Sequence, residues 1–226
     1  NHSESDHALF IASKTIDSSR DWYIWSDHNP GWKQPFDISS GPTWHSFEDR
    51  YYYGIFSKDL PDFNLRNKSV VDYHLNSIRF WLNMGFDGIR LDAAHTLIEN
   101  GRGKLEDQPE NTKVLNNVKN VVENEYDNKL LICEGPSDYA RYARACGHSF
   151  AFGLNYDLIK SVINGEASGR LSYNMWHADG VDLSQTGVFL ANHDPFAGAR
   201  LMEQFKNNIS NYKLASALLL TMPGIP

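Results

Sequence analysis

Three apolar runs in the sequence end at, or within three residues of, an acidic side chain; these acids are Asp92, Glu134 and Asp194. Bringing carboxylates together is electrostatically costly, so a purely structural protein has little reason to do it. Glycoside cleavage uses such a group, because one carboxylate attacks the anomeric carbon while a protonated carboxyl donates to the leaving oxygen. Like-charge neighbours and partial burial raise the pKa of one carboxyl and keep it protonated. The structural alternative is three helix N-terminal caps at strand-to-helix loops.

Arg90 precedes Asp92 by two positions, at the end of the run Gly88–Leu91. Alternate residues of a strand point to the same side, so these two side chains are expected to share a face. A cation beside a carboxylate favours its ionised form, which suits a nucleophile and disfavours a proton donor. Taken alone, the stretch also fits a buried strand that ends in a capping Asp.

The elements that must hold these acids follow a repeating strand-then-helix order. Apolar residues recur at helical spacing from Val70 to Leu82, with Asn67 as a predicted cap and Gly85 as a stop. The remaining predicted elements are strands at 86–91, 130–133, 149–153 and 186–191, and helices near 111–126, 137–146, 156–164, 200–208 and 211–218. Continuous apolar strands alternating with helices predict an α/β protein with a parallel sheet.

The spacing of the acids fits a closed barrel of such units. Asp92 and Glu134 are 42 positions apart, and Glu134 and Asp194 are 60 apart. A unit of an eightfold (β/α) barrel takes about 30 residues, so the gaps fit one long unit and two units. The carboxyl ends of barrel strands surround one opening, where the three acids would meet.

Residues 3–65 have a different composition and are predicted to be mostly irregular. Glycine and proline recur there, and four of the six tryptophans lie in the first fifth of the chain. Short strands are expected near 20–25 and 50–56. Most of these aromatic rings are expected to form a core of their own, and a minority could stack on sugars.

Composition limits the classes of function. The net charge of −7 argues against a nucleic-acid or anionic-membrane surface, and no apolar run reaches the about 20 residues that span a bilayer. The only two cysteines, Cys133 and Cys146, lack metal-ligand spacing, which leaves one disulfide open.

Several blocks of the sequence resemble, in order and spacing, those of the α-amylase family of glycoside hydrolases (glycoside hydrolase family 13). These blocks are Asn1-His2, Asp62-Phe63-Asn64, Gly88–His95, Ile132-Cys133-Glu134-Gly135 and Phe189–Asp194. The resemblance implies a partial (β/α)8 TIM barrel, from about the end of strand 3 to strand 8. Residues 1–2 would end strand 3, residues 3–65 would form an inserted subdomain, and residues 66–226 would supply the barrel units. Because both ends look truncated, we expect an interior piece of a longer protein that is unstable and inactive alone.

The resemblance also implies roles for individual residues. Asp92 would be the nucleophile, Glu134 the general acid/base, and Asp194 the acid that holds sugar hydroxyls. Substrate contacts would come from His2, Arg90, His193 and His95, and His177 could line the pocket. His95 is followed by threonine where many α-amylases have Lys-His, so its contacts are the least determined.

The implied activity is retaining cleavage of α-glucosidic bonds in maltooligosaccharides or related α-glucans. Within the family, the resemblance favours the α-glucosidase and oligosaccharide-acting branch. The alternatives are a transglycosylase of the same family and a catalytically inactive binding relative. No cofactor is required, although Asn1 is a calcium ligand in some members. The expected partner is an oligosaccharide, with no nucleic acid and no membrane span; localisation and oligomeric state are not indicated.

Overall fold

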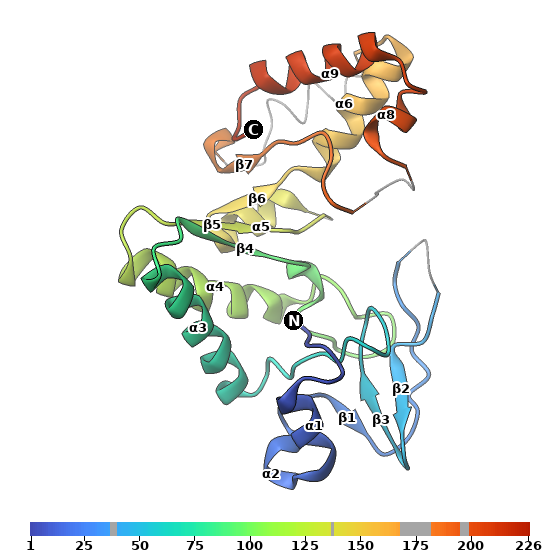
Figure 1. Cartoon of the computed structure of the whole chain (residues 1–226), viewed down its shortest axis with the longest axis vertical. Helices are drawn as coiled ribbons and strands as arrows, with labels where there is room; N and C mark the ends of the chain where they lie inside the picture. Colours follow the sequence, from blue (N-terminus) through green and yellow to red (C-terminus); the bar gives the residue numbers. More distant parts are fainter. Residues whose placement is uncertain (37–39, 137, 168–181, 195–198) are drawn as a thin grey trace. The chain divides into compact units, whose positions relative to one another are not determined.

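The computed structural model describes residues 1–36, 40–136, 138–167, 182–194 and 199–226 (Figure 1). The chain divides into two compact units, Asn1–Lys129 and Leu130–Pro226, which are described one at a time.

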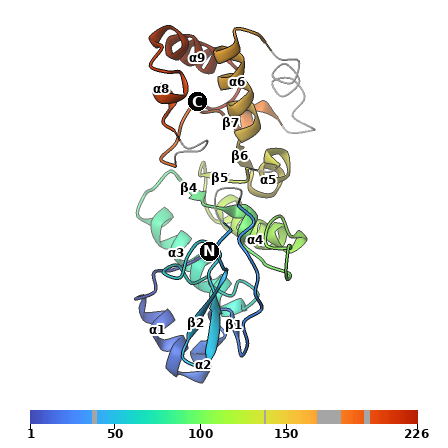
Figure 2. The same ribbon diagram turned by 90° about the vertical axis from the view of Figure 1, so that its right-hand side faces the viewer.

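The first unit begins with an aromatic-rich region built on a small antiparallel sheet. Its strands β1 (Trp25–Ser26), β2 (Trp44–Phe47) and β3 (Arg50–Tyr53) lie in the order β1-β3-β2. Helices α1 (Ala8–Thr15) and α2 (Asp17–Arg20) precede the sheet (Figures 1 and 2). The region is therefore less irregular than its sequence predicted. Helix α1 buries only Phe10 and Ser13, too few residues to produce a helical pattern.

Aromatic rings form the core of this region, as expected. Tyr23 and Tyr53 are almost fully buried, and Trp44 is 6% exposed. Phe10 packs edge-on against Tyr23, with 4.9 Å between the ring centroids. The predicted strand at 20–25 is wrong for most of its length, because α2 occupies residues 17–20 and β1 starts at Trp25.

The rest of the first unit contains α3 (Lys68–Asn83), β4 (Gly88–Leu91), a 3-10 turn η1 (Ala94–Thr96) and α4 (Pro109–Glu125). The predicted start of α3 is confirmed, because the Asn67 side chain accepts a hydrogen bond from the Ser69 amide at 2.8 Å. Gly85, beyond its end, has a φ of 98°, which glycine adopts without strain. Helix α4 has proline in its first turn.

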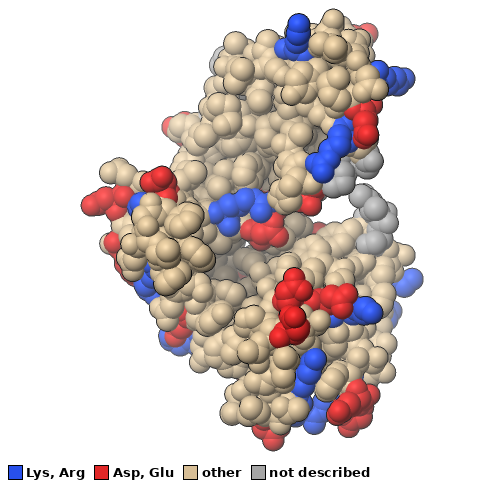
Figure 3. Space-filling view, in the orientation of Figure 1, with Lys and Arg blue, Asp and Glu red and all other residues tan. Residues whose placement is uncertain are grey.

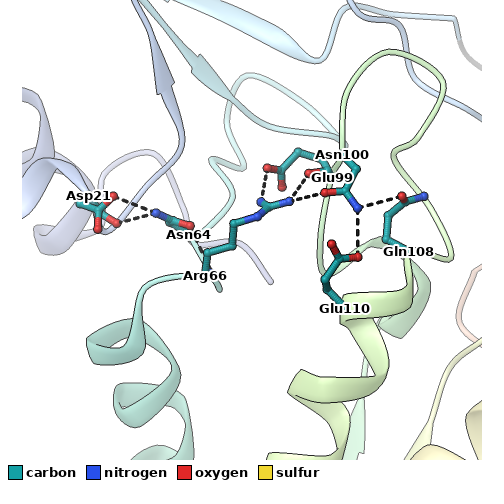
Figure 4. A network of polar contacts seen from close by, with 7 residues as sticks. All are labelled: Asp21, Asn64, Arg66, Glu99, Asn100, Gln108 and Glu110. Atoms are coloured by element: carbon teal, nitrogen blue, oxygen red, sulfur yellow. Dashed lines mark hydrogen bonds and ion pairs between the residues drawn. The ribbon is translucent and has the colours of Figure 1, made fainter.

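A polar network fixes the loop that leads from β4 to α4 (Figure 4). Arg66 lies 2.5 Å from a carboxylate oxygen of Glu99 and also donates to the Glu99 carbonyl and, at 2.8 Å, to Asn100. The Asn100 amide then donates to Gln108 and Glu110, both at 3.0 Å. The network thus ties the middle of the loop to Arg66, two residues before α3, and to the start of α4.

The second unit is a parallel sheet with helices. Strands β5 (Leu130–Cys133), β6 (His148–Phe150) and β7 (Thr186–Gly187) are paired in parallel in that order. The helices are α5 (Tyr139–Cys146), α6 (Phe152–Asn164), α8 (Leu201–Gln204) and α9 (Ile209–Thr221), and η2 (Leu183–Gln185) precedes β7. This confirms the predicted α/β class with parallel strands.

Two elements of the second unit differ from the prediction. Strand β7 ends at Gly187, because the Val188 amide donates to the Ile225 carbonyl, so the apolar run leaves the β6 ladder. Helix α8 is short because Lys206 and Asn207 take positive φ angles of 52° and 59°. The core packs Leu158 of α6 against Val188, with both side chains buried. None of the helices in the described residues is long and apolar enough to cross a membrane.

His74 predicts an acid-sensitive component of stability. Its Nε2 is buried and has no hydrogen-bond partner among the residues that the structure describes, and burial lowers the pKa of His74 to about 4. Unfolded histidine titrates near 6.5, so below that pH the unfolded chain binds the extra proton and stability falls toward pH 4. We expect His74→Gln to remove on the order of 1–2 kcal/mol of this pH-dependent loss, allowing for the ring's partial exposure.

Urea unfolding of the full-length protein at pH 4.5, 5.5 and 6.5 would measure it. His28 is exposed, so His28→Gln is the matched control and should keep the wild-type slope. Equal slopes in wild type and His74→Gln would contradict the assignment.

The Arg66–Glu99 pair yields a second prediction. The Glu99 side chain is only 10% exposed, and burial raises its pKa while Arg66 opposes that effect. Arg66→Met would leave the carboxylate unpaired and should lower the unfolding free energy by about 2–3 kcal/mol. Adding Glu99→Gln should recover part of the loss.

Lys68→Met supplies the matched control, since the Lys68–Asp72 pair has exposed side chains and should contribute less than about 0.5 kcal/mol. Denaturant midpoints of the four proteins would compare these values. Similar losses in Arg66→Met and Lys68→Met would show that the loop does not depend on the network.

Candidate active site

Asp92 follows β4 directly and is held by Arg90. The Arg90 guanidinium lies 2.7 Å from the Asp92 carboxylate, so the two side chains share a face as expected from the strand alternation. About half of the Asp92 side chain is exposed. A carboxylate that is held in place and still reachable by solvent is arranged as a nucleophile requires.

The backbone after Asp92 is fixed by hydrogen bonds from distant residues. Asn111, fully buried in α4, donates to the carbonyls of Ala94 and His95 at 3.3 and 2.7 Å. Asn1 donates to the Thr96 hydroxyl at 2.9 Å. These hydrogen bonds therefore hold residues 94–96, at the start of the loop that follows Asp92.

His95 lies mostly inside this loop. Its Nε2 is 3.3 Å from the Glu106 carboxylate, and its side chain is 12% exposed. Its Nδ1 is buried and has no hydrogen-bond partner within the described part of the chain. Glu106 could not be predicted as a partner from the sequence, because it lies in an irregular loop eleven positions away.

His2 lies in the same unit as Asp92 and within range of its charge. Burial lowers the pKa of His2, and the Asp92 carboxylate opposes that effect. The ring packs edge-on against Phe56, with 5.4 Å between centroids. A neutral imidazole in this place could exchange hydrogen bonds with a sugar hydroxyl.

Two buried oxygen atoms of the first unit are of the type that calcium binds. Asn1 Oδ1 and Asp62 Oδ1 are buried and have no hydrogen-bond partner among the described residues. Burial raises the pKa of Asp62 to about 7. Both atoms suit the oxygen preference of calcium, which takes six to eight ligands. Within the described ranges, no group of three or more His, Cys, Asp or Glu side chains is placed to hold a metal.

A pocket of about 240 Å³ lies beside Arg90 and Asp92 within the first unit. Its other lining residues come mainly from the apolar sides of α3, β4 and α4. Sugar hydroxyls need polar partners when they are buried. Few of the side chains that line this pocket could therefore bind sugar hydroxyls.

Glu134 follows β5 and is buried, with 6% of its surface exposed. Cys133, the residue before it, forms a disulfide with Cys146. The two cysteines thus form the disulfide that the sequence left open. The burial of Glu134 suits a group that must carry a proton in part of a reaction cycle.

His193 and Asp194 lie after β7, in the second unit. His193 Nε2 is 3.3 Å from Asp194, and both side chains are exposed. The Asp194 amide donates to the Asn192 side chain at 2.7 Å. Arg200 donates to the carbonyls of Asn192 and His193 at 3.2 and 3.3 Å, a role that its place at the start of a predicted helix did not indicate. His177 lies outside the described residues.

The two units divide the predicted site residues. The first holds His2, Arg90, Asp92 and His95, and the second holds Glu134, His193 and Asp194. Arg90 contacts Asp92, and His193 contacts Asp194, while His95 pairs with Glu106. Asp92 and Glu134 directly follow β4 and β5, whereas Asp194 lies seven residues beyond the end of β7.

Comparison with known proteins identifies one family over the whole chain. The family profile described as the alpha amylase catalytic domain matches residues 1–226. "Alpha-amylase 3" of Dictyoglomus thermophilum is 28% identical over 236 residues, covering 100% of this chain and 44% of its own length. "Trehalose synthase" of Pimelobacter sp. is 26% identical over 276 residues, covering 100% of this chain and 48% of its own. The chain thus spans about half the length of these relatives.

Among solved structures, an alpha-amylase from H. orenii is similar in fold, with a TM-score of 0.81 and 24% sequence identity. That likeness covers 100% of this chain and 47% of the other. With the profile match over all 226 residues, the chain belongs to the alpha-amylase family of glycoside hydrolases (glycoside hydrolase family 13).

Proposed function

We propose that the protein containing this chain is a retaining glycoside hydrolase that cleaves α-glucosidic bonds of maltooligosaccharides or related α-glucans. The observation that carries the proposal is the Arg90–Asp92 ion pair, at 2.7 Å, directly after β4 in a chain of this family. The buried Glu134 after β5 supports it with a second carboxyl of different environment. Two carboxyls in unlike surroundings are what a double displacement needs.

In the first step, the Asp92 carboxylate attacks the anomeric carbon and the glycosidic bond breaks. Glu134 gives its proton to the departing oxygen, so the leaving sugar departs as a neutral alcohol. Arg90 keeps the nucleophile in place through the ion pair. The product of the step is a covalent glycosyl-enzyme.

In the second step, the Glu134 carboxylate takes a proton from water, and the water oxygen attacks the anomeric carbon. Asp92 leaves, and the configuration of the sugar is retained after two inversions. Asp194, His193 and His2 are proposed to hold hydroxyls of the sugar that becomes attached. His95 is proposed as a further substrate contact, and its ring is paired with Glu106.

The finer assignment of the fold belongs to the same proposal. Residues 1–2 would end barrel strand 3, residues 3–65 would be the subdomain inserted after it, and residues 66–226 would be the following barrel units. The parallel order of β5, β6 and β7 with intervening helices supports the last of these ranges. The aromatic core around Tyr23 also contains Val70 and Ile98, so residues 3–65 pack in one compact unit with the residues that follow them.

No cofactor takes part in these steps. Calcium, if bound, would be structural and would use Asn1 as one ligand. The proposed partner is a carbohydrate rather than a nucleic acid, in line with the net charge of −7. On the face drawn in Figure 3, acidic and basic side chains are interspersed rather than gathered into one basic surface.

The proposal predicts the effect of neutralising either acid. Asp92→Asn or Glu134→Gln in the full-length protein should lower kcat on a maltooligosaccharide by about 10³-fold or more, because each removes a group that takes part in bond cleavage. Asp87→Asn is the matched control, since Asp87 is a fully exposed acid just before β4. Wild-type rates in either of the first two variants would refute the assignment.

Glucosyl transfer is the second candidate, and the similarity to a protein named trehalose synthase favours it. A transferase would pass the glycosyl group from Asp92 to a sugar hydroxyl in place of water. With isotopically labelled glucose as the added acceptor, a hydrolase should leave the label in free glucose, since water remains the more abundant nucleophile. Label in a disaccharide or longer product would identify the transferase.

The products should be separated by chromatography, with maltose, isomaltose, sucrose, trehalose and starch each tested as substrate. Turnover of none of them by wild-type protein, with bound oligosaccharide detected by calorimetry, would instead identify an inactive binding relative.

A further inference from the structure

The backbone on both sides of Glu134 is attached to the same helix, α5. Before it, Cys133 at the end of β5 is bonded to Cys146 at the end of α5, with 6.1 Å between the Cα atoms. Both cysteines are buried, with 0% and 1% exposure. The disulfide closes a short loop of the chain that contains Glu134.

After it, Gly135 lies directly against the ring of Tyr142. A Cβ placed on Gly135 would be 2.0 Å from that ring, closer than side-chain carbon atoms approach one another. Tyr142 is in α5 and only 1% exposed, so the ring has no free space to move into. The residue after Glu134 is therefore fixed by packing, and only glycine fits there.

The neighbouring strand supplies a third attachment. The Ser149 hydroxyl donates to the Cys133 carbonyl at 3.1 Å, and Cys133 is paired with Ser149 in the β5–β6 register. The peptide group that leads into Glu134 is thus bound to β6 on one side and covalently to α5 on the other. An acid after a buried strand has no need of this many attachments if its position is unimportant.

We propose that the Cys133–Cys146 disulfide and the Gly135–Tyr142 contact position the Glu134 carboxyl for proton transfer. This rests on the proposed function, in which Glu134 is the general acid/base. Cys133, Cys146 and Tyr142 are positioning residues, since they act through the Glu134 backbone. The reason for such attachment is that proton transfer needs hydrogen-bond distance to the leaving oxygen, and a displacement of 1 Å can cost about 10²-fold in rate.

The test compares two substrates that differ in their need for a proton donor. The sugar that leaves from a maltooligosaccharide departs as an alkoxide unless its oxygen is protonated. Fluoride leaves from α-glucosyl fluoride without a proton. In the full-length enzyme, Cys133→Ala/Cys146→Ala should lower kcat/KM for the maltooligosaccharide by about 10- to 100-fold and for the fluoride by less than about 3-fold. Gly135→Ala should give a split in the same direction. Glu134→Gln sets the upper limit of the split.

A matched control separates positioning from stability. Leu158 of α6 is buried in the core of the second unit, so Leu158→Ala should destabilise the fold by a similar amount. It should leave the ratio of the two kcat/KM values as in wild type. Equal losses on both substrates in the double cysteine variant, or no loss, would overturn the proposal.

Reduction of the folded wild-type enzyme covers the case in which the double variant fails to fold. A dithiol transfers two electrons and two protons to the disulfide, giving two thiols and a cyclic oxidised reagent. Thiols counted by alkylation and mass spectrometry should rise together with the same substrate split, and reoxidation should reverse it. A reduced enzyme with the wild-type ratio would also overturn the proposal. Failure of the proposed function is distinct, because Glu134→Gln would then keep the wild-type ratio.

Discussion

Placing a carboxyl beyond the end of a strand is the constraint on which the candidate site depends. The strand fixes direction, but the residue after it has left the ladder and needs other contacts. After β4 these contacts are the Arg90 ion pair and the hydrogen bonds from Asn111 and Asn1. After β7 they come from the Asn192 side chain and from Arg200. Each acid thus has its own local attachments within its unit.

Local patterns in the sequence were sufficient for elements whose stability is local. The cap at Asn67, the apolar face of α4 and the continuous run of β5 all lie within one element, and the structure has them where expected. Helix α6 begins at Phe152, four residues before its predicted start, because Phe152 and Leu154 are buried within its first turn. Strand β7 is shorter than its apolar run, since Ile225, far along the chain, takes the next hydrogen bond.

Contacts between distant residues could not be read from the sequence. Arg66 and Glu99 are 33 positions apart, and nothing in either segment indicates the other. His95 shows the consequence at the site, because its motif predicted a substrate contact and its ring pairs with Glu106. The three acids were predicted because strand ends can be recognised locally and because the sequence blocks around them resemble those of one family. Which side chains hold each acid in place is a property of the tertiary packing.

The kind of attachment differs between two of the acids in a way that fits their proposed roles. Asp92 would be an anion whenever substrate is attacked, so a guanidinium at 2.7 Å both orients it and stabilises the state it needs. Glu134 would gain and lose a proton in every cycle. A disulfide, a packed glycine and a hydrogen bond to a backbone carbonyl carry no net charge. These three attachments can therefore fix the backbone around Glu134 in both protonation states.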